Sequence, residues 1–353
     1  MSLLTDEEKE SLSIRRMIFH VVGKTLEEPI LLQEISPPEH ADFFLKRVES
    51  VLRGNLFEFK PYSNVERILR LVAKDGDDFT EHTQELARDF QRQHHSRTMS
   101  MGVFFVFEMG LGDGKTIYAL IKYDNEDVVR YVLDNTGKPQ VPRLERFCES
   151  FVRKAEAMQK IALVRLAEDQ GGKVVVRDRS EPAHISDYFE AFLQVRRINS
   201  PADMSGKLVE AFKQTFKDHR TSLPPDIQKG GVNRIYEVMR QGGHRFDPEN
   251  PEPIITSIFG QVADDSPLRK TLTRLLKEKG IANETFDIDP KSVQKPTRCR
   301  MKTAEGTQII YDEGHKPLQR PHADGKRIEI VIVTTQVIED DVDIENNPRS
   351  NRS

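Results

Sequence analysis

The sequence contains no tryptophan and only two cysteines in 353 residues. Cys148 and Cys299 are far apart in the chain and do not form a disulfide framework, so we expect both to stay reduced. No apolar run approaches the roughly 20 residues that a membrane-spanning helix needs. The first ten residues, MSLLTDEEKE, are polar and acidic, unlike a secretory signal. These absences predict a cytoplasmic protein without a membrane segment.

The chain also lacks an excess of positive charge. It has 53 Lys and Arg against 57 Asp and Glu, a formal net charge of −4, and its pI is about 6.2. The protein is therefore not basic throughout, and any site for nucleic acid must be a local basic patch. With 37% hydrophobic and 31% charged residues, the composition predicts a folded protein. The length fits two domains, or one domain with appendages.

The segment Gly110–Thr116, GLGDGKT, is similar to a phosphate-binding loop but lacks its spacing. That loop needs a glycine five positions before Gly114, where this chain has Met109. The flanking runs VFFVF and TIYALI favour strands, whereas a phosphate-binding loop leads into a helix. The adjacent His94 and His95 would point about 100° apart on a helix, which disfavours joint metal binding. We therefore predict no nucleotide, no metal and no other cofactor.

The order of strand-like and helix-like segments predicts an α+β fold. It consists of an N-terminal antiparallel-sheet domain with helices, a helical middle section and a C-terminal β-hairpin. The predicted N-terminal domain comprises residues 1–180, with a central β-hairpin over 103–123. A helix-rich section follows over 181–281, and strands return over 282–337. The last segment, 338–353, is polar and acidic and is predicted to be disordered.

Local patterns predict several individual elements. The runs IRRMIFHVVG and PILLQEIS, near residues 14–35, are strand-like. Helical spacing of apolar residues predicts helices over 41–52 and 64–74. Two further helices are expected after Ser200-Pro201 and Ser266-Pro267, because serine is a preferred N-cap and proline fits the first helical position.

Several segments together resemble the bacterial nucleoid-associated protein family, the NdpA/YejK-like group. They are HADFFLKRVESVL, the run FTEHTQELARDFQRQHHSRTMSMGVFFVFEM followed by KTIYALIKYD, and CRMKTAEGTQIIYD with RIEIVIV near the end. The segments occur in the family's order and extend over nearly the whole chain. The resemblance implies a protein that binds DNA and is found with the bacterial nucleoid, and it supplies no catalytic residues. The long acidic C-terminal tail departs from the family pattern.

Basic residues gather in two places. Between Arg269 and Lys302 there are ten Lys and Arg against four acids, a local net charge of +6. Such a patch favours DNA because neutralising phosphates releases counterions. Arg298, Arg300 and Lys302 alternate along a predicted strand, which places them on one face. An ordinary solvated helix face remains the alternative for the helical members. The predicted DNA-binding residues are Arg269, Lys270, Arg274, Arg298, Arg300, Lys302, Lys213, Lys217 and Arg220.

The function predicted from these patterns is non-catalytic binding of DNA, taken to be double-stranded, mainly through its backbone. One alternative is a metal-dependent nuclease, because Glu58 and Lys60 match the Glu-x-Lys half of such a site and Asp42 lies upstream. Another is a protein–protein adaptor whose acidic tail, Glu339–Glu345, engages a basic partner or mimics DNA. The sequence is compatible with a homodimer but does not determine the oligomeric state or any sequence preference in DNA.

Overall fold

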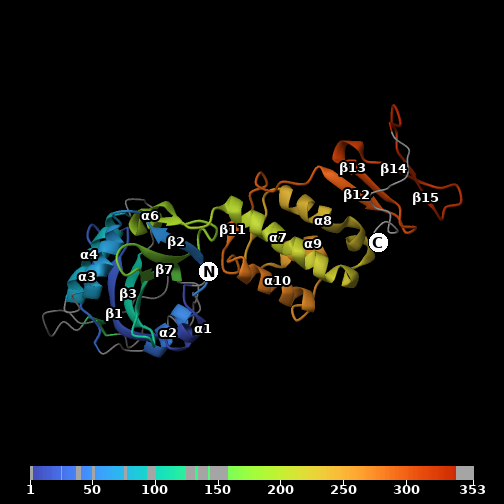
Figure 1. The fold of residues 1–353 in the computed structure, drawn as a ribbon. Coiled ribbons are helices and arrows are strands. Elements are labelled where there is room, and N and C mark those ends of the chain that lie inside the picture. Colours follow the sequence, from blue (N-terminus) through green and yellow to red (C-terminus); the bar gives the residue numbers. More distant parts are fainter. Residues whose placement is uncertain are drawn as a thin grey trace, which may run out of the picture. The chain divides into compact units, whose positions relative to one another are not determined.

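The computed structural model divides the chain into two compact units, Met1–Val293 and Gln294–Ser353, and Figure 1 shows their elements. The structure describes residues 3–24, 26–36, 41–49, 52–74, 78–93, 101–124, 132–133, 142–143 and 158–338. Cys148, His94 and His95 lie outside the described residues, as do residues 339–353 of the predicted acidic tail.

The first unit contains a seven-stranded sheet in the order β1-β3-β4-β7-β8-β2-β9. Every neighbouring pair is antiparallel. Valine, isoleucine, phenylalanine and tyrosine are frequent in these strands, and such side chains favour a pleated, half-buried surface. The strands are β1 (Ser13–Val22), β2 (Asn55–Phe59), β3 (Gly102–Gly110), β4 (Thr116–Asp124), β7 (Met158–Leu166), β8 (Gly172–Asp178) and β9 (Val195–Arg197), with a separate short pair formed by β5 (Val132–Leu133) and β6 (Pro142–Arg143).

The loop that is similar to a phosphate-binding loop is the turn of a β-hairpin, as the sequence predicts. β3 pairs with β4, and Gly110 lies opposite Thr116. β4 begins at Thr116, where a phosphate-binding loop would begin a helix. Gly114 has φ +81, a left-handed conformation that glycine adopts without a steric penalty. The Lys115 ammonium pairs with the Asp113 carboxylate inside the turn.

β7 and β8 form another antiparallel hairpin of the sheet. The predicted strand PILLQEIS, in contrast, is wrong. Only Ile30 and Ile35 form isolated bridges with β1. Between them, the Leu32 N–H donates to the His20 Nδ1 at 3.2 Å. The His20 side chain therefore accepts a backbone N–H that would bond to a neighbouring strand if the segment were a continuous strand.

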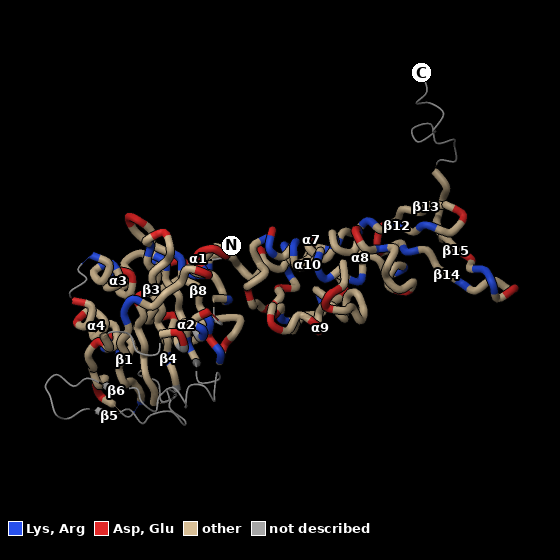
Figure 2. Tube along the Cα trace, turned by 90° about the horizontal axis from the view of Figure 1, so that it is seen from below, with Lys and Arg blue, Asp and Glu red and all other residues tan. Residues whose placement is uncertain are grey.

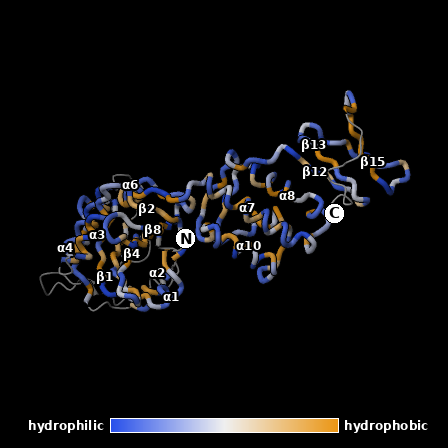
Figure 3. Tube along the Cα trace, viewed as in Figure 1, coloured by the Kyte–Doolittle hydropathy of each residue, from blue (hydrophilic) through white to orange (hydrophobic). Residues whose placement is uncertain are grey.

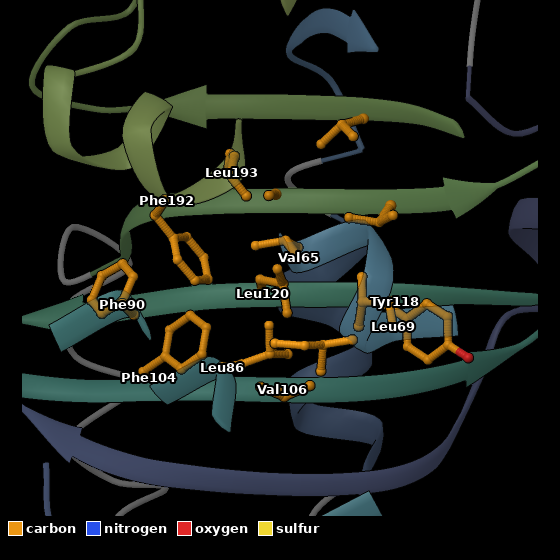
Figure 4. Close-up of a cluster of buried hydrophobic side chains, with 14 of the residues drawn as sticks. Val65, Leu69, Leu86, Phe90, Phe104, Val106, Tyr118, Leu120, Phe192 and Leu193 are labelled. Carbon is orange, nitrogen blue, oxygen red and sulfur yellow. The ribbon is translucent and has the colours of Figure 1, made fainter. Parts of the chain in front are cut away.

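The sheet has a hydrophobic core on each face, because neighbouring side chains on a strand point in opposite directions. On one face, Phe105 and Phe107 of β3 contact Phe44 of α2, with ring centroids 5.2 and 5.5 Å apart. On the other face, Phe104 stacks on Phe90 of α4 at 4.7 Å, and Phe192 of α6 meets Phe90 edge-on at 5.0 Å (Figure 4). The helices of this part are α1 (Asp6–Glu10), α2 (Ala41–Glu49), α3 (Asn64–Lys74), α4 (Phe79–Arg92) and α6 (Asp187–Leu193).

A helical section with its own core follows the sheet. Ser200 and Ser266 begin two of its helices, and each hydroxyl accepts a backbone N–H of the first turn, from Asp203 at 3.1 Å and from Arg269 at 3.2 Å. Phe212 and Phe259 meet edge-on in the core, 5.9 Å apart. The elements are α7 (Pro201–His219), η3 (Arg220–Ser222), α8 (Pro225–Arg240), β10 (Arg245–Phe246), α9 (Glu252–Phe259), α10 (Pro267–Glu278) and β11 (Phe286–Asp287), and β10 pairs with β11.

Buried polar contacts join this helical section to the edge of the sheet. Glu284 is 3% exposed; it accepts the Leu56 N–H of β2 at 3.1 Å and pairs with Arg197 of β9 at 2.9 Å. β9 follows residue 180, where the sequence predicts that the first domain ends, and its pairing with β2 extends the sheet. The predicted domain boundaries stay predictions.

The C-terminal unit contains two hairpins. β12 (Arg298–Lys302) pairs with β13 (Gln308–Asp312), and β14 (Leu318–Pro321) pairs with β15 (Ile328–Val331), with η4 (Glu313–His315) between the hairpins. No large hydrophobic side chain of residues 294–338 is buried. With the large antiparallel sheet, the helices and these terminal hairpins, the predicted α+β class is confirmed.

Candidate nucleic-acid interface

The β12 face, which we define as Arg298, Arg300 and Lys302, consists of three exposed residues at alternate positions of β12. Figure 2 colours the Lys and Arg positions along this strand blue. The three cationic residues are exposed while the intervening Cys299 and Met301 are partly buried, so the predicted alternation is confirmed. Across the register, Arg298 lies opposite Asp312, and the other two lie opposite uncharged residues. None of the three forms an ion pair with a residue that the structure describes.

Two other cations of the same unit are neutralised locally. The Lys295 ammonium pairs with Glu313 at 2.5 Å, and the Arg327 guanidinium pairs with Asp324 at 2.6 Å. The charge of the β12 face is thus more available to an external anion than the charge of Lys295 or Arg327.

The α10 stripe, which we define as Lys270, Arg274 and Lys277, is a second exposed basic surface. Residues spaced by three and four lie on one side of a helix, and all three side chains are exposed. The Arg274 guanidinium also pairs with Glu278 at 2.5 Å, so Lys270 and Lys277 are the more available charges. They lie along a shallow depression of about 420 Å³. The depression is lined by Asp264, Arg269, Lys270, Thr273, Arg274, Lys277 and Glu278. Lys277 belongs to the basic segment of the sequence but is absent from the predicted contact residues, although its helical spacing from Lys270 and Arg274 indicates the shared face.

Arg269 does not lie on the exposed face where the prediction places it. It is 7% exposed, and its guanidinium pairs with Glu252 of α9 and, at 3.4 Å, with Asp264. Burial lowers the pKa of this guanidinium from its usual value. Position 269 precedes the buried Leu272 by three residues, so it lies at the edge of the apolar side of α10. We therefore leave Arg269 out of the interface proposed below.

The predicted cations Lys213 and Lys217 lie on α7 and Arg220 lies on η3, and the end of α7 is brought beside α10. Lys217 and Arg220 are exposed, and the two helices meet where the His219 Nε2 lies 2.8 Å from the Thr271 Oγ1. Lys213 is only half-exposed, and its ammonium lies 5.7 Å from the centroid of the Tyr236 ring. The end of α7 thus lies against the first half of α10 within the first unit.

The residues of the nuclease alternative have other partners. The Glu58 carboxylate pairs with Arg196 at 2.7 Å, and the Lys60 ammonium pairs with Glu190 at 2.8 Å. Asp42 is exposed on α2. Within the described ranges, no group of three or more His, Cys, Asp and Glu side chains could hold a metal ion. The structure therefore does not assemble these residues into a metal site within the part of the chain that it describes.

No helix in the described part of the chain is both long enough and apolar enough to span a membrane. A search of curated proteins finds no match. A family model described as nucleoid-associated protein YejK matches residues 18–337. The match includes both hairpins of the C-terminal unit as well as the sheet and the helical section. The chain therefore belongs to the family of the nucleoid-associated protein YejK, and its place in the cell is the bacterial nucleoid in the cytoplasm.

Proposed function

We propose that this protein binds double-stranded DNA without catalysis, mainly through the phosphate backbone, and that the β12 face is its principal contact surface. Membership of a nucleoid-associated family supports association with DNA. Contact with the phosphate backbone is supported by the row of three exposed cations on β12. These cations have no ion-pair partners among the described residues. The α10 stripe is proposed as a second contact.

Electrostatics and shape both support a duplex. Cations that neutralise phosphates release condensed counterions, which gives affinity without regard to sequence. A two-stranded β-ribbon is also narrow enough to enter the major groove. Proteins that bind single strands usually add aromatic side chains on which bases stack. Among the described residues, Tyr62 is the one large aromatic side chain that is exposed, and it belongs to neither basic surface.

The proposed lack of catalysis is supported by the partners of Glu58 and Lys60. A Mg²⁺ ligand and a catalytic lysine would have to leave the ion pairs with Arg196 and Glu190 before they could act. The acidic tail of the adaptor alternative, Glu339–Glu345, lies outside the described residues, and it remains a separate hypothesis.

We expect the triple change Arg298→Ala, Arg300→Ala, Lys302→Ala to weaken binding to all duplexes about equally. Each lost phosphate contact removes about 0.9 from the slope of log K against log [salt], so the slope should become shallower by about three units if all three residues contact phosphates. A fluorescence-anisotropy titration at several salt concentrations measures both quantities. Parallel titrations with a single strand of the same length test the preference for a duplex.

A matched control removes three exposed positive charges elsewhere. Lys46, Arg53 and Lys74 are exposed around the sheet, so changing all three to alanine lowers the net charge equally. This control should change the slope much less than the β12 variant. Equal losses in the two variants would indicate a general charge effect. An unchanged slope in the folded β12 variant would remove this face from the interface, and DNA cleavage in Mg²⁺ would contradict the non-catalytic proposal.

A further inference from the structure

The hairpin of β12 and β13 has one open edge. These two strands make up their whole sheet, so the other edge of β12 pairs with no strand that the structure describes. The Glu313 N–H donates to the Thr297 carbonyl at 2.8 Å, and the Thr303 N–H donates to the Thr307 carbonyl at 2.9 Å. Backbone groups of alternate residues point to the same edge of a strand, so the odd-numbered residues over 297–303 bond towards β13. The backbone groups of the β12 face therefore point to the open edge.

The two faces of this hairpin differ in chemistry. One carries the three cations of the β12 face. The other carries partly buried side chains, which are Cys299, Met301, Ile309 and Tyr311, and Figure 3 shows the hydrophobic positions along β13. A two-stranded hairpin is marginally stable in water, whereas three or more strands with a hydrophobic face form a stable sheet. The open edge therefore suits a strand in which acidic and apolar residues alternate.

The acidic tail of the same chain has this alternation. The segment Asp341–Glu345, DVDIE, alternates acids with Val342 and Ile344. Over residues 339–345, five of the seven residues are acidic and none is basic. In a strand, the acids of this segment would lie on one face and its apolar side chains on the other. The acidic tail is therefore complementary to β12 in both charge and hydrophobicity.

An antiparallel pairing aligns the two patterns residue by residue when Asp343 lies opposite Arg300. Unlike charges directly opposed across two strands stabilise their pairing. The other pairs of this register are Asp341 with Lys302 and Glu345 with Arg298 on the charged face, and Val342 with Met301 and Ile344 with Cys299 on the apolar face. Every acid of the segment thus meets a cation, and both apolar residues extend the partly buried face of the hairpin.

The tail follows a strand that ends near β12. Val331, the last residue of β15, pairs with Leu318 of β14. The next residue of β14, Gln319, has its Nε2 3.9 Å from the Met301 Sδ of β12. Asp341 follows Val331 by ten positions, and an extended chain of that length reaches roughly 33–36 Å. The acidic tail is therefore long enough to reach the open edge of β12 in its own chain.

We propose that Asp341–Glu345 binds along the open edge of β12 in the same chain, as a third, antiparallel strand. The acids then neutralise the β12 face, and the tail backbone bonds to the free groups of the edge. Phosphates have to displace the tail before they reach the three cations, so the tail competes with DNA. The competition rests on the proposed DNA contacts of the β12 face, whereas the binding of the tail to β12 does not.

A disulfide tests the binding of the tail and its register without DNA. In the full-length chain with Cys148→Ser, Ile344→Cys should form a disulfide with the native Cys299 in oxidised glutathione. The two residues would form a non-hydrogen-bonded antiparallel pair, in which the Cα atoms are about 4.5 Å apart, a separation that a disulfide accepts. Val342→Cys in the same background is the matched control and should react more slowly, because it lies two positions out of register.

The product should migrate as a single chain on a non-reducing gel and lose both free thiols. Three results would overturn the proposal. The folded Ile344→Cys variant could form no disulfide, Val342→Cys could react faster than Ile344→Cys, or the disulfide could form only between two chains.

DNA titrations at low salt test the competition. Truncation after Ile338 should strengthen binding to a duplex by about fivefold or more, because a covered site lowers the apparent affinity in proportion to the fraction that is free. The same truncation in the β12 triple-alanine variant should change the affinity by less than about twofold, since the surface that the tail covers no longer binds phosphates. An equal gain in both backgrounds would indicate a general charge effect and contradict the competition.

A variant with unchanged charge separates the pattern of the tail from its composition. Val342→Asp combined with Asp343→Val breaks the alternation, so this variant should bind DNA nearly as tightly as the truncated chain. Binding equal to that of the unmodified chain would overturn the register. If the disulfide forms but neither truncation nor the β12 triple variant alters DNA binding, the proposed function fails and the binding of the tail does not. If the triple variant weakens DNA binding but no disulfide forms and truncation has no effect, only the proposal for the tail fails.

Discussion

Replacing Asp178 with asparagine is expected to lower the free energy of unfolding by about 3–5 kcal/mol, the usual effect of removing one partner of a buried ion pair. Asp178 ends β8, and its carboxylate pairs with the Lys160 ammonium of β7. The two side chains are 0% and 4% exposed. The change would leave the lysine charge buried without its counter-charge, and an uncompensated buried charge is strongly unfavourable.

Asp178 also organises the chain that leaves the sheet. Its two oxygens accept N–H groups from Ser180, Glu181 and Ser186 at 3.0, 3.2 and 2.9 Å. The hydroxyls of Ser180 and Ser186 donate to it at 2.8 Å. Burial raises the pKa of this carboxyl, but the hydrogen bonds from Lys160, the Ser186 N–H and Ser180 outweigh burial, so the pKa lies below its ordinary value. The residue is therefore charged at neutral pH.

Chemical unfolding in urea measures the expected loss. Glu58→Gln is the matched control, because Glu58 and Arg196 form an exposed ion pair, and such pairs contribute about 1 kcal/mol or less. Adding Lys160→Met to Asp178→Asn should recover part of the stability by removing the uncompensated charge. A loss below about 1 kcal/mol for Asp178→Asn would show that the buried pair contributes no more than an exposed one.

Elements with a local signal were predictable from the sequence. The β3–β4 hairpin follows from two strand-forming runs around a glycine-rich turn. The starts of α7 and α10 follow from the Ser-Pro pairs. The exposed β12 face follows from the alternation of residues along a strand. In each case the determining interaction spans only a few residues, so the local pattern is sufficient.

Features that depend on distant partners were not predictable in this way. Arg269 belongs to a basic segment of the sequence, yet the structure buries it because Glu252 of another helix supplies a counter-charge. The Lys160–Asp178 pair joins residues that are 18 positions apart on two strands, and neither residue stands out in the sequence. PILLQEIS has the composition of a strand, but the His20 side chain takes one of its backbone donors.

The contrast between local signals and distant partners also applies to the proposed DNA interface. Charge density along the sequence identifies the segment between Arg269 and Lys302, but it cannot separate exposed cations from paired ones. Only the folded chain distinguishes the exposed Arg300 from Lys279, whose ammonium pairs with Glu210 at 2.7 Å. Counting Lys and Arg in the sequence therefore overestimates the number of positive charges that remain for phosphates.

His20 is expected to make the first unit acid-sensitive. It lies on β1 between Ile18 and Val22 and is 0% exposed. Its Nδ1 accepts the Leu32 N–H, and its Nε2 has no hydrogen-bond partner among the described residues. Burial, followed by the charge of Arg88 on α4, lowers the pKa of His20 from 6.5 to about 3. The imidazole is therefore neutral in the folded protein throughout the physiological range.

The direction of the pH effect follows from proton binding. Between pH 6.5 and about 3, the unfolded chain binds a proton at His20 that the folded chain does not bind. Stability therefore falls as the pH drops below 6.5 and is fully present above it. With a shift of this size, acidification from pH 7 to pH 5 should remove about 2 kcal/mol through this residue alone. Other groups also titrate in this window, so the contribution of His20 must be isolated by substitution.

His20→Asn is the informative change, because the asparagine oxygen can still accept the Leu32 N–H while the side chain no longer titrates. The variant should be less stable at pH 7, since a smaller side chain leaves space in the core. However, it should lose about 2 kcal/mol less than the unmodified protein between pH 7 and pH 5. Urea unfolding at both pH values measures the difference, and His315→Asn, at an exposed histidine, should reproduce the unmodified slope. If His20→Asn kept the full acid sensitivity, His20 would have to titrate near its ordinary pKa in the folded chain, which would require water or a hydrogen-bond acceptor at its buried Nε2.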